Sequence, residues 1–248
     1  MVERNFKIWR GDSKGGDFVN YKVSVDEGMV VLDALKLIQA EQANDMAVRW
    51  NCKAGKCGSC SMEINGKPKL ACMDRVTDYK EDSQITVQPV KTFPVIKDLV
   101  TDLSWNYEQN KKITPFTPKP RENGGKYRMY QADVDRVQEF RKCIECYLCQ
   151  DVCHVLRDHG KKNKFVGPRF MIRLASLEMH PLDTADRIPE IKNEYGSGHC
   201  NITKCCTEVC PESIKITDNG IIPMKERVVD RYYDPFLKMF RVFSGGKK

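Results

Sequence analysis

The sequence predicts an α+β protein, with a mixed N-terminal domain at residues 1–105 and a mostly helical domain at residues 126–248. Three observations predict this class. Apolar and polar residues alternate along much of the N-terminal part, which is typical of half-buried strands. The segment 111–125 is rich in proline and glycine and marks a linker, which we place at residues 106–125. Beyond it, apolar residues recur at helical spacing.

Strands and one helix open the N-terminal domain. Residues 6–8 and 21–25 alternate apolar with polar side chains and are predicted strands. The segment 28–45 follows, and its apolar residues from Val31 to Ile38 have the spacing of a helix with one buried face.

A hairpin is predicted after this helix. Asn65-Gly66 lies between SMEI and KPKLAC, and this dipeptide suits the positive φ angles of a type I′ turn. The run QITVQPV, residues 84–90, then supplies a closing strand. The N-terminal domain is therefore expected to be a compact sheet crossed by one helix.

Four segments of the second domain read as helices. They are residues 133–142, a helix opening near Pro168 in the segment 167–180, residues 183–195 and a last segment near 224–242.

Composition limits the classes of function. The chain of 248 residues has 41% hydrophobic and 30% charged residues, a soluble globular balance without a run long enough to cross a bilayer. The net charge of +7 comes from basic residues mixed with acids, without the aromatic-interleaved basic stripe of nucleic-acid-binding proteins. No apolar signal core opens the sequence, so we expect a bacterial or archaeal cytoplasmic chain.

The twelve cysteines are too many for an ordinary intracellular protein unless most of them bind a ligand. A disulfide scaffold is one alternative, but the chain is much larger than most disulfide-stapled domains, and its cysteines cluster two or three residues apart.

The first cysteine group has the spacing C-x4-C-x2-C with a distant fourth cysteine, which is the plant-type pattern for a two-iron cluster. Gly55 and Gly58 let the backbone turn its N–H groups toward sulfur. A zinc knuckle is the alternative, although zinc sites usually pair two close cysteine pairs. The predicted [2Fe-2S] ligands are Cys52, Cys57, Cys60 and Cys72.

The second group begins with a run of C-x2-C-x2-C-x3-C, and a later stretch ends in Cys210-Pro211. Two-cluster ferredoxins carry two such runs, and the fourth cysteine of each run binds the cluster of the other. On that template, Thr203 occupies the second position of the later run. The predicted [4Fe-4S] ligands are Cys143, Cys146, Cys149 and Cys210.

The remaining site has three thiolates, which indicates a [3Fe-4S] cluster bound by Cys153, Cys200 and Cys206. Cys205 is left over. It is either a small packing residue or a replacement fourth ligand that would restore a fourth iron. One departure from the template is His154, which stands where a proline closes the usual run.

NCKAGKCGSC, CIECYLCQDVC and CNITKCCTEVCP, in this order around a proline-rich linker, resemble the iron–sulfur subunits of succinate dehydrogenases and fumarate reductases. The likeness runs from the first strand to about residue 235. It implies a β-grasp plant-type ferredoxin domain followed by a helical, bacterial ferredoxin-like domain with two clusters.

The resemblance also implies partners and a mechanism. The chain would carry electrons, as part of an oxidoreductase complex, between an FAD flavoprotein that handles succinate or fumarate and a membrane quinone. The flavoprotein would contact the N-terminal domain, and a cytochrome b-type membrane anchor would contact the helical domain. FAD, quinone and any haem belong to these partners or their interface. The expected location is peripheral, on the cytoplasmic side of the bacterial plasma membrane.

The quinone pocket of the family is not reproduced in this sequence. Several members place a quinone-pocket tryptophan shortly after the position of Cys153, but the only tryptophans here are Trp9, Trp50 and Trp105, so no quinone residue is carried over. The aromatic and basic tail, residues 230–243, is expected either to contact the anchor or membrane or to pack in the core.

Three alternative functions remain. They are a heterodisulfide reductase subunit, a free multi-cluster ferredoxin and a zinc-binding module.

Overall fold

The computed structural model describes residues 2–121, 124–160, 162, 164–236 and 239. It divides into two compact units, and each combines separate parts of the chain. The first unit contains residues 1–107, 144–152 and 209–212, and the second contains 108–143, 153–208 and 213–248. A search of the described helices found none that is both long and apolar enough to span a membrane.

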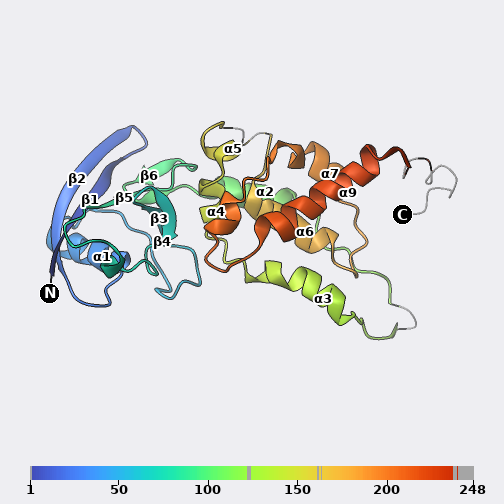
Figure 1. Cartoon of the computed structure of the whole chain (residues 1–248), viewed down its shortest axis with the longest axis horizontal. Coiled ribbons are helices and arrows are strands. Elements are labelled where there is room, and N and C mark those ends of the chain that lie inside the picture. The colour runs from blue at the N-terminus through green and yellow to red at the C-terminus, as the bar shows by residue number, and fades with distance from the viewer. Residues whose placement is uncertain (1, 122–123, 161, 163, 237–238, 240–248) are drawn as a thin grey trace. The chain divides into compact units, whose positions relative to one another are not determined.

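The first unit is built on a mixed sheet, in which seven strands are found among the described residues. Strand β1 is central: it pairs antiparallel with β2 and β6 and parallel with β5 (Figure 1). From one edge the order is β4-β3-β5-β1-β6-β7, with β2 attached to β1. The strands are β1 (Val2–Asp12), β2 (Gly15–Val25), β3 (Ser61–Ile64), β4 (Lys67–Leu70), β5 (Ile85–Gln88), β6 (Val95–Lys97) and β7 (Val100–Thr101).

Helix α1 (Val31–Glu41) packs its apolar face on this sheet. Leu32, Leu35 and Ile38 are fully buried and share a core with Phe6 and Ile8 of β1. The predicted strands, the helix and the hairpin are thus confirmed. The hairpin turn has φ of 48° at Asn65 and 74° at Gly66, both in the left-handed region that a type I′ turn requires.

The first unit also includes residues from the cysteine-rich C-terminal half of the chain. Short helix α4 (Leu148–Asp151) contributes Leu148, which is 1% exposed, to the sheet's core. The side chains of Asp151 and Thr92 are buried, and the Asp151 carboxylate accepts a hydrogen bond from the Thr92 backbone N–H. These contacts position the segment 144–152 on the sheet-rich part of the chain.

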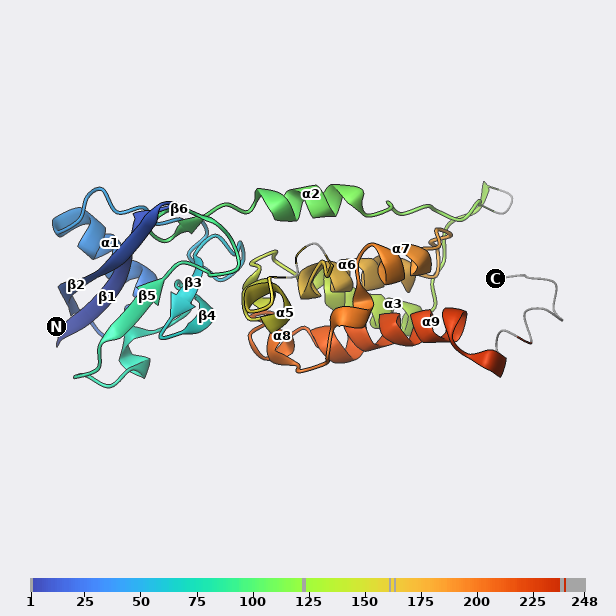
Figure 2. The same ribbon diagram turned by 90° about the horizontal axis from the view of Figure 1, so that it is seen from above.

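The second unit is helical, and the coarse division into a sheet-rich N-terminal region and a helical C-terminal region is confirmed (Figure 2). Its α-helices are α3 (Gln131–Gln138), α5 (His154–Arg157), α6 (Pro168–Glu178), α7 (Ile188–Asn193), α8 (Cys205–Glu208) and α9 (Ile222–Tyr232). Short 3₁₀ turns cover Glu139–Lys142 and Ser197–His199, and a π-helix, η5, covers Ile216–Ile221. Another 3₁₀ turn, Val76–Asp78, belongs to the first unit, and α2 (Ser104–Lys112) leads from the first unit into the second.

Two predicted helices are shorter in the structure. Only Ile188–Asn193 of the predicted 183–195 is helical, because the Asp183 carboxylate holds a turn by accepting hydrogen bonds from the backbone of Thr117 and Ala185. The last helix, α9, ends at Tyr232, shortly before Pro235, which cannot continue an existing helix. Pro235, Phe236 and Met239 are helical again, since proline is tolerated at the start of a helix. Residues 237–238 and 240–242 of that prediction, and Phe240 and Phe243 of the predicted contact tail, lie outside the described residues.

A buried arginine holds the middle of the predicted linker against the rest of the helical unit. Arg187 is fully buried, and it donates hydrogen bonds to the carbonyl oxygens of Thr114 at 2.8 Å and Pro115 at 2.7 Å. Its guanidinium also lies 2.9 Å from the buried carboxylate of Asp183. The linker backbone therefore satisfies a buried charge of the helical unit.

Candidate iron–sulfur cluster sites

The loop that carries the first three cysteines directs backbone N–H groups at sulfur. Cys52 lies on the exposed part of this loop, and its sulfur accepts hydrogen bonds from the N–H of Ala54 at 3.4 Å and of Lys56 at 3.3 Å. The Cys52 N–H points in turn at the sulfur of Cys57, 3.5 Å away. Such donors favour thiolates, so this geometry suits ligands of a metal cluster.

The other two cysteines of the first group are buried next to each other at the ends of the hairpin. Burial, together with the neighbouring thiol of Cys72, raises the pKa of Cys60 to about 12. Burial opposes ionisation of Cys57 too, but hydrogen bonds from Ser59 and Cys52 outweigh it and lower the pKa of Cys57 to about 7. All four predicted two-iron ligands thus gather in one place within the first unit.

The loop of the first cysteine group is in contact with the second cysteine run. Gly58 has φ of 69°, and a β-carbon built on it would lie 2.5 Å from the Cα of Cys146. The Ser61 hydroxyl donates to the carbonyl oxygen of Cys146 at 2.9 Å. Cys146, Cys149 and Cys210 all belong to the first unit, whereas the fourth predicted ligand of that cluster, Cys143, belongs to the second.

Polar contacts stabilise the surroundings of the first loop. The ammonium of Lys56 lies 2.7 Å from the carboxylate of Glu212, two residues after Cys210. Trp50 is 41% exposed, and the ammonium groups of Lys36 and Lys53 each lie 4.7 Å from the centroid of its ring system. Contact with Lys53 lowers the pKa of Lys36. An exposed indole with two like charges therefore stands beside Cys52.

The three predicted ligands of the second-unit site also come together. Cys153 and Cys206 are 6% and 5% exposed, and burial raises the pKa of each to about 11. Charge on Cys200 raises the pKa of Cys206, and charge on Cys205 raises the pKa of both buried thiols. These four cysteines therefore lie within electrostatic range of one another. A group of iron ions would offset the cost of ionising the buried thiols.

Residues next to this site fix its loop. The Lys225 ammonium donates to the carbonyl oxygen of Cys200 at 2.6 Å, and the hydroxyl of Thr203 lies 3.4 Å from the sulfur of Cys205. The hydroxyl of Thr217 lies 3.4 Å from the sulfur of Cys206. Thr217 stands eleven residues after Cys206, outside the cysteine motif. Only the folding of the chain brings it to the site, so the motif did not predict it.

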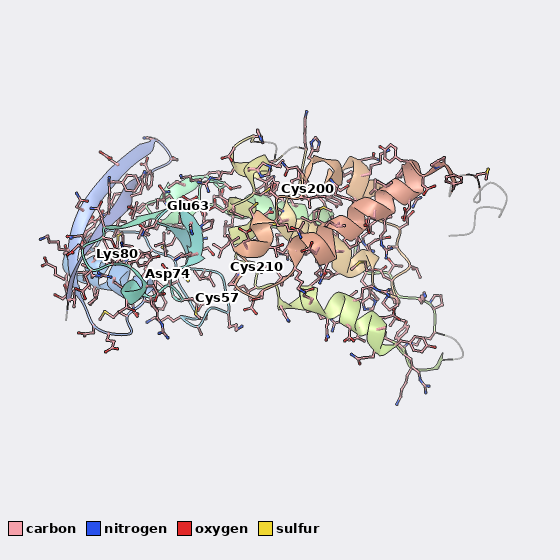
Figure 3. The ribbon with its side chains drawn as sticks, in the orientation of Figure 1. Cys57, Glu63, Asp74, Lys80, Cys200 and Cys210 are labelled. Atoms are coloured by element: carbon pink, nitrogen blue, oxygen red, sulfur yellow. The ribbon has the colours of Figure 1, made fainter. Side chains whose placement is uncertain are left out.

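The backbone of the cysteine loops adopts unusual conformations. Of the eight non-glycine residues with positive φ among the described residues, five lie inside the cysteine runs. Such backbone is costly and tends to persist where N–H groups must converge on an anion. The five residues are Lys53, Glu145, Tyr147, Ile202 and Lys204. Cys57 of the first group and Cys200 and Cys210 of the later stretch can be located in Figure 3.

The cysteine side chains fit iron–sulfur clusters in number and chemistry. All twelve are free thiols, so the disulfide scaffold is wrong. Within the part of the chain that the structure describes, no group of three or more Cys, His, Asp or Glu side chains has the geometry to hold a single metal ion. That criterion concerns one ion, whereas an iron–sulfur cluster distributes its thiolates over several irons.

Comparison with known families agrees with this chemistry. Residues 5–108 match the model of a 2Fe-2S iron–sulfur cluster binding domain, and residues 139–214 match that of a 4Fe-4S dicluster domain. Both types of cluster-binding domain are therefore present in the chain.

Individual relatives narrow the family. The chain is 32% identical to a fumarate reductase iron–sulfur subunit of Mycobacterium tuberculosis, over 79% of this chain and 80% of the relative. A chain in the structure of the Mycobacterium smegmatis Sdh1 complex in the apo form is 60% identical, with a TM-score of 0.92, 94% of this chain covered and 98% of that one.

Some relatives are longer. An uncharacterised iron–sulfur protein of Methanococcus maripaludis is 33% identical over 86% of this chain, which spans only 42% of that protein's length. The two mycobacterial proteins, by contrast, are matched over most of their length, at 80% for the M. tuberculosis subunit and 98% for the chain of the M. smegmatis complex. The chain belongs to the family of iron–sulfur subunits of succinate dehydrogenases and fumarate reductases, which are electron-transfer subunits of oxidoreductase complexes.

Proposed function

We propose that this chain transfers electrons between an FAD flavoprotein that handles succinate or fumarate and a membrane quinone, as a subunit of a succinate dehydrogenase or fumarate reductase (quinone) complex. Three clusters would serve this transfer: [2Fe-2S], [4Fe-4S] and [3Fe-4S]. When bound, such clusters take up and release single electrons, and the flavin of the partner handles the electron pair.

The contact between Gly58 and Cys146 carries this proposal. Residues from the two-iron loop and from the four-iron run touch within one unit. Cys52, Cys57, Cys60 and Cys72 would hold the two-iron cluster, and Cys143, Cys146, Cys149 and Cys210 would hold the four-iron cluster. Because their loops are in direct contact, these residues would keep the first two clusters close together.

The second unit would hold the third cluster through Cys153, Cys200 and Cys206. The missing thiolate at Thr203 supports a three-iron cluster, since a corner without a thiolate can lose its iron. Cys205 stays beside this set as either a packing residue or a fourth ligand. By the family resemblance, this cluster would lie nearest the quinone, and the two-iron cluster would lie nearest the flavin.

The finer parts of the fold are also proposed. The sheet crossed by α1 would be a β-grasp, plant-type ferredoxin domain at residues 1–105, and residues 126–248 would form the two-cluster domain after a linker at 106–125. The mixed sheet and the helices that surround the second group of cysteines support this assignment.

Partners and location follow from the same proposal. The indole of Trp50, two residues before Cys52, is exposed and flanked by Lys36 and Lys53. It would suit the surface of this chain that contacts the flavoprotein. A cytochrome b-type anchor, with quinone near its interface and haem where the anchor contains it, would bind the helical unit. The chain would then be peripheral, on the cytoplasmic side of the bacterial plasma membrane.

Copurification and spectroscopy test this function. A tagged chain purified anaerobically from its native host should bring along an FAD protein and a membrane protein, and it should reduce quinone with succinate. Its low-temperature magnetic resonance spectra should contain signals of all three cluster types. A fully loaded monomer without either partner would favour a diffusing ferredoxin, and copurification with a thiol-dependent reductase without flavin-linked succinate activity would favour a heterodisulfide reductase.

A further inference from the structure

The hydroxyl of Thr217 is aimed at one of the proposed cluster ligands from a separate structural element. Its oxygen lies 3.4 Å from the sulfur of Cys206, and the two residues are 1% and 5% exposed. We infer that Thr217 donates a hydrogen bond to the Cys206 thiolate and thereby raises the reduction potential of the cluster that Cys206 binds. This inference rests on the proposed ligand role of Cys206.

The direction of the hydrogen bond follows from its neighbours. A thiolate bound to iron has no proton to donate, so the Thr217 hydroxyl must be the donor in the loaded protein. The hydroxyl of Thr207 donates to the Thr217 oxygen at 3.2 Å and accepts the Thr217 backbone N–H at 3.1 Å. This reciprocal pair supplies a donor to the Thr217 oxygen and leaves the Thr217 hydroxyl proton for sulfur.

The backbone holds Thr217 in place. Thr217 lies in the π-helix η5, a rare conformation that is frequent at functional sites. This turn packs against α6 and α9. At Gly220 an added β-carbon would lie 2.9 Å from a methyl group of Ile172, so glycine permits the close approach to α6.

A hydrogen bond to sulfur shifts the redox equilibrium in one direction. Reduction adds negative charge to the cluster, and a donor to its sulfur stabilises the more negative state. Because both residues are buried, water screens this interaction weakly. Around Cys52 the donors are backbone N–H groups, whereas at Cys206 the donor is a side chain that substitution can remove.

The test compares Thr217→Val with Thr217→Ser in the intact complex. A redox titration, followed by the electron paramagnetic resonance signal of the cluster, measures its reduction potential. Thr217→Val keeps the side-chain shape without the hydroxyl. It should make one-electron reduction of this cluster about tenfold less favourable, a shift of about 59 mV to lower potential. Thr217→Ser keeps the hydroxyl and should restore most of the wild-type potential. An unchanged potential in a fully loaded Thr217→Val complex would overturn the inference.

Thr207→Val provides a second measurement for the case in which Thr217→Val loses the cluster. It removes the group that donates to the Thr217 oxygen, and we expect a smaller shift of the same sign. No shift in a loaded Thr207→Val complex would then count against the inference. The Thr217 effect requires only that Cys206 binds a cluster, of three irons or of four. The wild-type spectrum shows separately whether this cluster has three irons, so a failure of the proposed function can be told from a failure of this inference.

Discussion

The contact between Gly58 and the second cysteine run makes a quantitative prediction for Gly58→Ala. Gly58 adopts φ of 69°, a left-handed conformation that disfavours residues with a β-carbon. The β-carbon would also lie 2.5 Å from the Cα of Cys146 and 2.9 Å from its nitrogen, closer than such atoms can approach. The clash is with backbone, so no side-chain rotation relieves it.

The expected cost has two parts. The left-handed backbone costs roughly 1 kcal/mol for alanine relative to glycine. Forcing the loop away from Cys146 adds about 1–3 kcal/mol, the usual cost of overpacking. Gly66→Ala separates the two parts, because Gly66 has φ of 74° and no atom lies within 4 Å of an added β-carbon. It should lose only the roughly 1 kcal/mol of backbone preference.

Thermal unfolding of the intact complex, followed through the visible absorption of the clusters, measures the difference. Gly58→Ala should lower the midpoint at least twice as far as Gly66→Ala. Gly58→Ala should also alter the magnetic resonance signal of the two-iron cluster, because the displaced loop carries its ligands, whereas Gly66→Ala should leave that signal unchanged. Equal midpoints and unchanged spectra for the two variants would refute the proposed packing of these loops.

Two further changes test other parts of the structure. Cys57→Ser should weaken or alter the two-iron cluster while succinate binding persists; an unchanged spectrum and quinone reductase rate would remove Cys57 from the ligands. Arg187→Met should destabilise the complex by about 3–5 kcal/mol in denaturant titration, because it leaves buried Asp183 unpaired. Its control is Arg227→Met, which breaks a partly exposed pair with Glu178 and should cost under about 1 kcal/mol.

Elements with strong local signals were predictable from the sequence. The apolar face of Val31–Ile38 and the Asn65-Gly66 turn each act over a few residues, and the structure contains both as predicted. The π-helix at Ile216–Ile221 has no comparable local signal, since packing against α6 favours it. The predicted helix at 183–195 was too long because the hydrogen bonds of Asp183 with a distant segment outweigh helix formation.

The candidate sites show the same distinction. Cysteine spacing alone allowed a prediction of which thiols bind the same cluster, because the motifs are local. The spacing carried no information about residues that reach a site through tertiary structure, such as Ser61 at the Cys146 carbonyl or Thr217 at the Cys206 sulfur. Nor did the sequence indicate that residues 144–152 would pack with the sheet-rich unit, because that depends on buried partners such as Thr92.

Whether the third site binds three irons or four depends on Thr203 and Cys205, which stand close together. The Thr203 oxygen lies 3.4 Å from the Cys205 sulfur, so Thr203→Cys alone would place two thiols within reach of a disulfide. The informative variant is therefore Thr203→Cys combined with Cys205→Ser. It supplies a thiolate at the second position of the run and removes the competing thiol.

If the template is right, the wild-type complex has an oxidised three-iron signal, and Cys205→Ser alone leaves this signal intact. In the double variant the signal should fade, and a four-iron cluster of lower potential should replace it, because an added thiolate favours the oxidised state. Electron delivery to quinone should slow accordingly. The opposite pattern would be a wild-type complex that lacks the three-iron signal and gains it in Cys205→Ser. It would identify Cys205 as the fourth ligand, because Cys205 lies close enough to raise the pKa of both Cys153 and Cys206.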